Sequence, residues 1–288
     1  QHSARRVRGS MAITTRDQLI DAMGNKASRI VIDKANIANA AAGQYLSLWR
    51  ATGQPGQGAI PANAGTCNNA LTGAMNFAQQ TAPATSYGAW SNAVCSNNAV
   101  TIEVHDRLMH MGGLVGNVTT AQTVNLNLNG VTADNMVERK GDANFSDVQW
   151  WAEWYTDTGA TASNATVAVT YNDGTTGSLT TFAAGGTVRA GRMIPLNNLI
   201  PAAAAGKFIR SIDTVTLSAS TGTAGSFGFT ATRPRMTMPL LLANKMEVFD
   251  WAQLGLPEIF NSSCLSLIEL CSTTSTGTVR GGGKIAHG

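Results

Sequence analysis

Residues 148–182 read VQWWAEWYTDTGATASNATVAVTYNDGTTGSLTTF and alternate strand-like runs with loops of Thr, Gly, Asn and Asp. In an extended chain, successive side chains point to opposite faces. Val148, Trp150 and Trp154 then share an apolar face, which predicts core. Trp151 and Tyr155 share the opposite face with carboxylates, which indicates a partly solvent-exposed surface that another molecule or segment contacts. The stretch therefore predicts an all-β scaffold with an adhesive outer face.

The rest of the chain extends this pattern. From residue 147 to 240, strand signals recur every ~10–15 residues, which is close to the rhythm of a sandwich or barrel. Asn172-Asp173-Gly174 between two such runs predicts a hairpin. Near the start, Thr15 and Gln18 fit a capping box for a short helix ending near Gly24. We therefore expect an all-β, jelly-roll-like β-sandwich with a short N-terminal helix and long extended loops.

The chain divides into three parts by composition. Residues 1–10 are either a basic arm or a remnant of cloning before Met11. Residues 11–98 are expected to hold the helix, some strands and, from 52 to 98, an extended excursion that becomes ordered against neighbouring subunits. Residues 99–288 are expected to form the β-sandwich domain, with CLSLIELC (264–271) and TGTVRGGGKIAHG (276–288) as a closing hairpin.

Composition limits the partners. Charged residues make up 13% of the chain, about half the usual ~25%, and the low charge favours a subunit inside an assembly. The net charge is +3, with Arg5, Arg6 and Arg8 crowded into the first ten residues. The remainder is nearly neutral, which argues against a nucleic-acid-binding face. No apolar run approaches the ~18 residues of a membrane span, so we expect no membrane partner.

The four cysteines carry no metal-binding spacing. A disulfide between Cys67 and Cys95 would require an oxidising environment, and buried reduced thiols are the default expectation. Cys264 and Cys271 are seven residues apart and would lie on opposite faces of one strand, so they could not bond each other.

Catalytic patterns were weighed against structural ones. His105 and His110, with Glu103 and Asp106, match no zinc-protease spacing, and the structural interpretation is a strand end before a Gly-rich turn. Glu153 and Asp157 would be ~13 Å apart on one strand, whereas glycosidase pairs need ~5–9.5 Å. The sequence therefore predicts no enzyme, no catalytic residue, no metal and no cofactor. Trp90, Trp151 and Tyr155, with Arg5, Arg6 and Arg8, are the candidate interface or ligand contacts.

The chain resembles virion structural proteins of tailed bacteriophages, of the head-decoration (cement) type and related tail or fibre components. The resemblance lies in Thr/Ala/Gly/Asn-rich strands such as ATVAVTYNDGTTGSLTTF (165–182) and DTVTLSASTGTAGSFGFTAT (213–232), and it covers residues 100–288. It implies a β-sandwich set on a capsid lattice, often as a homotrimer or larger. The implied partners are further copies and a major capsid protein or other virion protein, in a virion assembled in the bacterial cytoplasm. The alternative is a carbohydrate- or receptor-binding module of a tail or fibre.

Overall fold

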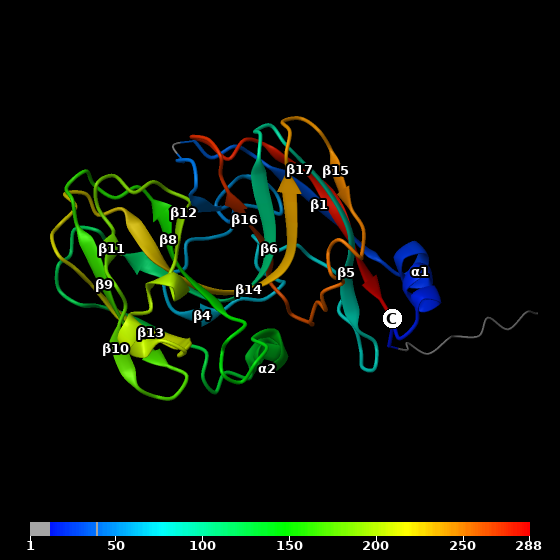
Figure 1. Ribbon diagram of the computed structural model, residues 1–288, viewed down its shortest axis with the longest axis horizontal. Coiled ribbons are helices and arrows are strands. Elements are labelled where there is room, and N and C mark those ends of the chain that lie inside the picture. The colour runs from blue at the N-terminus through cyan, green and yellow to red at the C-terminus, as the bar shows by residue number, and fades with distance from the viewer. Residues whose placement is uncertain (1–11, 39) are drawn as a thin grey trace, which may run out of the picture.

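The computed structural model describes residues 12–38 and 40–288. Its central element is a closed ring of antiparallel strands (Figure 1). Around the ring, each strand pairs with the next, and the last pairs with the first. The order is β14 (Ser226–Leu240), β8 (Gln149–Thr156), β12 (Arg192–Pro195), β2 (Tyr45–Ser47), β16 (Leu265–Leu270) and β6 (Val100–Leu114), which returns to β14. The short strand β4 (Gly65–Thr66) also pairs with β6.

Two further sheets flank the ring. Sheet A has the order β15 (Glu247–Phe249), β5 (Ser86–Cys95), β17 (Val279–His287), β1 (Ser28–Lys34) and β3 (Gly53–Gln54). Sheet B has the order β10 (Thr176–Ser178), β9 (Asn164–Tyr171), β13 (Ile209–Leu217) and β7 (Gln122–Asn127), and β11 (Phe182–Ala183) also pairs with β9. The helical elements are α1 (Arg16–Asn25), α2 (Met136–Arg139) and 3₁₀ turns at Ala133–Asn135, Asn197–Leu199 and Ala202–Ala204.

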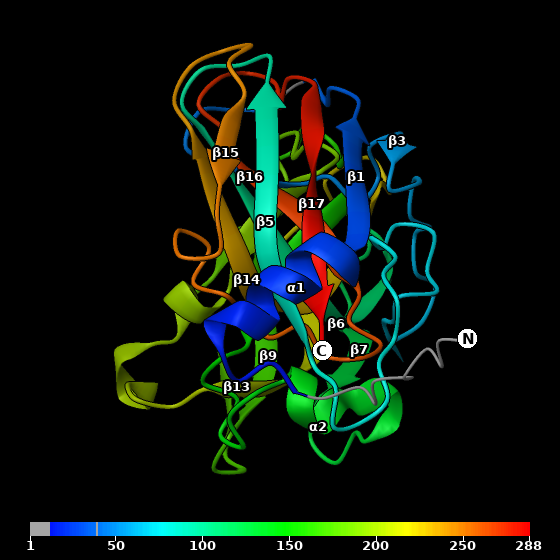
Figure 2. The same ribbon diagram turned by 90° about the vertical axis from the view of Figure 1, so that its right-hand side faces the viewer.

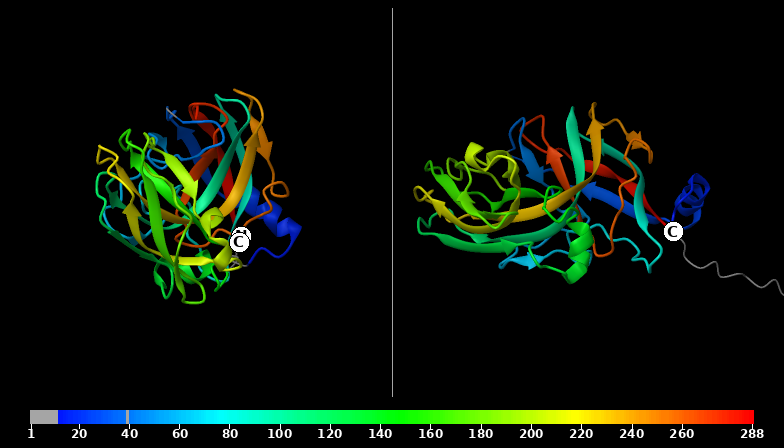
Figure 3. Two further views of the ribbon diagram at one scale, coloured as in Figure 1. Left: turned by 60° about the vertical axis from the view of Figure 1, so that its left-hand side comes forward. Right: turned by 60° about the horizontal axis from the view of Figure 1, so that its bottom comes forward.

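The outside of the ring is apolar and forms two cores, one with each sheet. Trp150, Trp154 and Phe229 pack against sheet B, whereas Val104 and Met238 pack against sheet A. The long strands β6 and β14 contribute to both cores and run between the two ends of the molecule (Figure 3). Because of this division, the ring and each sheet make a sandwich of their own.

The inside of the ring is polar. Arg107 on β6 makes a bidentate pair with Glu153 on β8, with nitrogen–oxygen distances of 2.6 and 3.2 Å. The Arg107 guanidinium also donates to Tyr155 Oη and Thr230 Oγ1 and lies over the ring of Trp49. Side chains from two ring strands, β8 and β14, thus satisfy one buried cation of a third, β6.

Much of the sequence-based fold is confirmed. The protein is all-β with sandwich packing and a short N-terminal helix, and the Thr15–Gln18 capping box is present. The predicted hairpin joins β9 to β10, with Gly174 at φ 87°. Trp150 and Trp154 are fully buried. Within the described residues, no helix is long and apolar enough to cross a membrane.

Three expectations about elements were wrong. Residues 86–95 form β5 in the middle of sheet A, and the preceding loop packs on its own chain: buried Lys34 donates to the carbonyls of Ala51 and Pro55. The chain does not turn after Asp106, because β6 continues to Leu114. Finally, β16 and β17 form no hairpin, since β16 lies in the ring and β17 pairs with β1 and β5. Strands from residues 11–98 and 99–288 therefore share one sheet.

The first prediction concerns the buried ion pair. Burial raises the pKa of Glu153, but the Arg107 guanidinium and the hydroxyls of Ser47 and Thr230 lower it more, so its pKa lies below the ordinary value. Glu153→Gln leaves the Arg107 charge uncompensated and should cost about 3–5 kcal/mol of unfolding free energy at neutral pH. Urea denaturation measures this loss.

The matched control is Asp33→Asn, which removes the exposed pair with Arg280 and should cost under about 1 kcal/mol. A carboxylate with a depressed folded-state pKa stabilises above its unfolded pKa, and that contribution is lost as the pH falls through the folded value. The wild type should therefore lose stability in acid more steeply than the Glu153→Gln variant. Equal costs for the two substitutions would contradict the role of the pair.

Candidate interaction surface

The outer face of sheet A carries a groove. Strand register places Val248, Asn92, Gly282 and Val31 in one row across β15, β5, β17 and β1. Gly282 has no side chain, so the middle of the row is hollow. The groove has a volume of about 570 Å³, and Trp90 and Met246 also line it.

The walls of the groove are apolar and accessible. Of the residues that line it, Val31 is 55% exposed and Met246 45%; Val248, beside the groove in the same row, is 54% exposed. The turn before β15 exposes Leu241 (68%) and Leu242 (55%). Isolated exposed aliphatic residues are ordinary, but a contiguous group on one face marks an interaction site. This group lies on one sheet and the turn that enters it.

The rim of the groove is cationic. Arg29 and Lys284 are directly opposite each other in the β1–β17 register, and like charges in that position destabilise a sheet. Lys284 Nζ donates to the carbonyl of Met23 at the end of α1, and Arg280 pairs with Asp33 at 3.1 Å. Three cations and one anion leave the rim positive, which favours an anionic partner.

Helix α1 closes one end of the groove. Leu19 and Ala22 pack on Ala89 of β5 and Ala286 of β17. Figure 2 shows α1 lying across the lower part of these strands and leaving the rest of the face uncovered. The helix forms locally because Thr15 caps it and the Gln18 side chain accepts from the Thr15 amide. Sheet A is thus covered over only part of its outer face.

The outer face of sheet B differs in chemistry. Its outward positions on β9 and β7 include Asn164, Thr166, Asn125 and Asn127, all exposed and polar. Such a face is satisfied by water. Of the two flanking sheets, sheet A is therefore the one whose outer face, at the groove, would gain free energy from being covered.

Trp90, among the residues that the sequence singled out, lies in the groove and is partly exposed. Its role as a contact stays a prediction. The expectation for Trp151 and Tyr155 was wrong: they are 0% and 3% exposed, inside the ring. Trp151 Nε1 donates to Thr232 Oγ1, and Tyr155 Oη lies 3.2 Å from Glu153. The mixture of polar and aromatic side chains on this face of β8 arises because the face points into the polar interior of the ring, and not because it is exposed to water.

Arg5, Arg6 and Arg8 lie outside the described residues. Val31, Val248 and Gly282 were not identified as contact residues from the sequence. The alternation in RIVID (29–33) does place Arg29, Val31 and Asp33 on one face, which is a usable signal. Their juxtaposition with β17 and β15 could not be read, because the pairing joins segments far apart in the chain.

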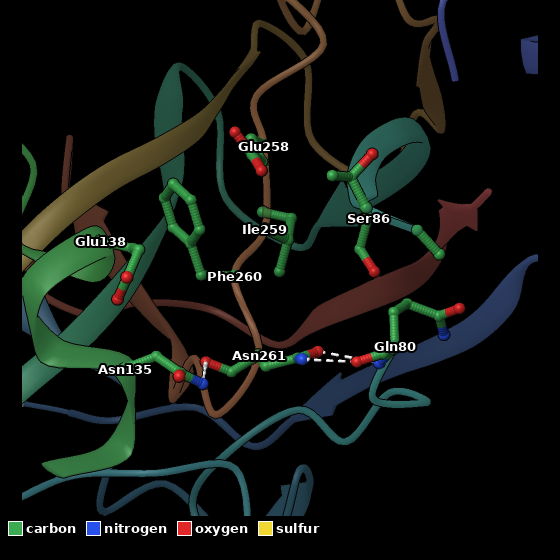
Figure 4. Close-up of a pocket in the computed structure, with 10 residues that line it drawn as sticks. Gln80, Ser86, Asn135, Glu138, Glu258, Ile259, Phe260 and Asn261 are labelled. Atoms are coloured by element: carbon green, nitrogen blue, oxygen red, sulfur yellow. Dashed lines mark hydrogen bonds between the residues drawn. The ribbon is translucent and has the colours of Figure 1, made fainter. Parts of the chain in front are cut away.

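A second, smaller pocket of about 220 Å³ lies beside α2 (Figure 4). Glu138 and Glu258 line it, as does Phe260. The Asn261 side chain, which also lines the pocket, is paired with the Gln80 backbone. Asn261 Oδ1 accepts from the backbone amide of Gln80 at 2.8 Å, and Asn261 Nδ2 donates to its backbone carbonyl at 2.7 Å. The polar groups of the Asn261 side chain are therefore used within the protein and shape the pocket.

The histidine cluster has a structural arrangement. His105 is buried between Glu103 (2.7 Å) and Thr232 (3.0 Å), and His110 Nδ1 accepts from Arg107 Nε. Across the described ranges, no group of three or more His, Cys, Asp or Glu side chains could hold a metal ion. Asp157, which the sequence places too far from Glu153 for a catalytic pair, forms an exposed salt bridge with Arg189.

Comparisons with known proteins give weak similarities. No family model matches the chain, and no curated protein matches it. Among solved structures, it is similar to a mutant VP2 protein of infectious bursal disease virus in derived T=1 particles, with 12% identity, coverage of 91% of this chain and 77% of that one, and a TM-score of 0.16. The Gx strain structure of the same virus gives 11% identity, coverage of 91% and 82%, and a TM-score of 0.18. TM-scores this low do not establish a common fold.

The second prediction concerns Glu269, a buried carboxyl between the ring and sheet A. Burial raises its pKa to about 8, and its Oε2 has no hydrogen-bond partner within the described residues. A raised folded-state pKa gives stability that is fully present below the unfolded value and is lost as the pH rises through about 8. Glu269→Gln should remove this loss, on the order of a few kcal/mol.

Urea denaturation from about pH 4 to about pH 9, a range that brackets the unfolded pKa (~4.3) and the folded pKa (about 8), checks this prediction. The Glu269→Gln variant should be more stable than the wild type at the alkaline end. Glu138→Gln, at an exposed position, is the control and should leave the pH profile unchanged. Parallel profiles for wild type and Glu269→Gln would show that Glu269 is ionised at no cost.

Proposed function

We propose that this chain is a non-enzymatic structural protein of a virion, which decorates or stabilises a phage capsid lattice through the groove of sheet A. The observation that carries the proposal is an uncovered apolar depression with a cationic rim on a sheet whose other side is core. The low charge of the chain and its resemblance to decoration proteins support the same role.

The chemistry of the groove selects its partner. Two copies meeting face to face would bring Arg29, Arg280 and Lys284 of each against the other with only Asp33 to offset them. The occupant is therefore a different virion protein, such as the major capsid protein, that presents apolar and acidic side chains. Self-association into trimers or larger species is part of the proposal but uses another surface.

The energetics fit a lattice protein. Covering exposed apolar surface contributes about 25 cal/mol per Å², so burying the groove residues supplies a moderate affinity after the entropy of association is subtracted. Many such contacts on one particle act together through effective concentration. Moderate single contacts are then sufficient to reinforce a shell.

The buried charges support a non-enzymatic role. Glu153 is held by Arg107 and Asp106 by Arg139, each inside the protein and outside the two pockets described above. Carboxylates neutralised in this way serve the fold rather than a substrate.

The alternative is a carbohydrate- or receptor-binding module of a tail or fibre. Trp151 and Tyr155, two of the aromatic ligand contacts expected from the sequence, are buried. The alternative now depends on Trp90 as the aromatic side chain in the groove. Glycan-dependent quenching of fluorescence that Trp90→Ala abolishes would favour this function over capsid decoration.

The third prediction tests the groove. The double variant Val31→Ser/Val248→Ser should bind capsids of the parent virus, prepared without this protein, about 10-fold more weakly, which corresponds to ~1.4 kcal/mol. Arg29→Glu should weaken binding further and reduce its salt dependence. Co-sedimentation with the capsids measures both effects.

Val137→Ser is the matched control, since Val137 is 50% exposed on α2, outside the groove. All variants should keep the wild-type melting temperature. Unchanged capsid binding by both groove variants would refute the assignment of this face. Light scattering across a concentration series tests the separate expectation of self-association, and a monomer at all concentrations would refute it.

A further inference from the structure

Two cysteines meet at one edge of strand β6. On that edge, β16 pairs with β6 from Leu270 to Leu265, and β4 continues along it at Thr66 and Gly65. The gap between them is spanned by Cys264, whose carbonyl accepts from the Arg107 amide at 2.8 Å, and by Cys67, whose amide donates to the Leu108 carbonyl at 2.8 Å. The two cysteines are therefore opposite consecutive residues of β6.

This register fixes their separation. Consecutive positions along a strand are about 3.3 Å apart. Cys67 and Cys264 belong to different segments with no peptide bond between them, so they must be slightly further apart than that. The two Cα atoms therefore lie close together at this edge, which is compatible with the ~4.4–6.8 Å Cα separation of disulfides. Both cysteines belong to the same buried cluster, with Trp49 and Tyr155, and each thiol influences the pKa of the other.

The surroundings make the two thiols unequal. Burial raises the pKa of Cys67, but hydrogen bonds from Cys264 and His110 and the charge of Arg107 lower it to about 5. His110 Nδ1 accepts from Arg107 Nε, which holds the imidazole ring beside this pair. The pKa of Cys264 is raised by burial and by Cys67. This asymmetry gives one nucleophilic thiolate and one resolving thiol.

We propose that Cys67 and Cys264 form a redox pair that closes to a disulfide when a peroxide is present. The Cys67 sulfur attacks a peroxide oxygen, the O–O bond breaks, and hydroxide leaves as water with the proton that Cys67 gave up. The sulfur of Cys264 then attacks the Cys67 sulfenic acid, forming the S–S bond. The S–O bond breaks, and a second water leaves with the proton of Cys264. Hydrogen peroxide takes up two electrons, one from each sulfur.

The remaining cysteines are placed differently. Cys95 donates to the Thr276 carbonyl in the core under sheet A, and Cys271 contacts Glu269. The conditional pair Cys67–Cys95 is not formed, since the two lie in separate clusters, and all four cysteines are free and buried, which was the default expectation. The redox pair goes beyond the proposed function and does not depend on it. In a virion it would close after release from the reducing cytoplasm.

Closure would join two chain segments that are far apart in sequence and would restrict the unfolded chain. For a chain of this size, the melting temperature should rise by roughly 5–15 °C. His110 acts here as a positioning residue. His110→Gln should therefore shift the pH profile of the oxidation rate to higher pH while leaving the final disulfide the same.

The test uses the full-length protein treated with hydrogen peroxide, followed by alkylation under denaturing conditions and non-reducing peptide mapping. The expected product is a Cys67–Cys264 cross-link with Cys95 and Cys271 alkylated. Cys95→Ser and Cys271→Ser should still form it, whereas Cys67→Ser and Cys264→Ser should not. A second sample, refolded from urea in a glutathione redox buffer, allows for slow access of peroxide to the buried site. A different pairing, or four free thiols in both samples, would overturn the proposal.

Discussion

The ion pair between Arg107 and Glu153 is the constraint on which the architecture depends. Both side chains are almost completely removed from water, at 1% exposure each, so each charge requires the other. Arg107 comes from β6 and Glu153 from β8, while Thr230, which donates to Glu153 and accepts from Arg107, comes from β14, the strand between them. An isolated buried charge costs several kcal/mol. Arrangements that separate these three strands are therefore disfavoured, and the ring is specified by its polar interior.

A polar interior directs the apolar side chains outward. The alternation of β8 places Trp150 and Trp154 on the outside of the ring. Exposing these side chains to water would be unfavourable, so a second sheet must cover them. Sheet B does this at one end of β6 and β14, and sheet A does it at the other. Each covering sheet then has an outer face of its own. The outer face of sheet B carries Asn and Thr side chains, whereas the outer face of sheet A carries Val31, Trp90 and Val248. Sheet A is thus the layer that leaves apolar surface exposed.

Local patterns predicted the local structure well. The capping box, the Asn-Asp-Gly hairpin and the burial of Trp150 and Trp154 follow from neighbours in sequence, and each was correctly identified. Alternation cannot distinguish water from the inside of a closed polar ring, because both accept Glu153 and Tyr155. For that reason Trp151 was misplaced on the surface. The groove could not be derived either, since it requires β1 to lie beside β17 and β17 beside β5, and no local signal encodes pairing between such distant segments.

The same cation connects the ring to the cysteine pair. Strand β6 is paired with β14 along its length, but its other edge is divided between β16 and β4, and the division falls beside Arg107. At this division, Cys264 and Cys67 each make one backbone hydrogen bond to β6, but they belong to two segments that are far apart in sequence. The guanidinium that neutralises Glu153 also lowers the pKa of Cys67 at that division. One charge thus holds the ring closed non-covalently on its inner side and favours the thiolate that a covalent closure of the edge requires.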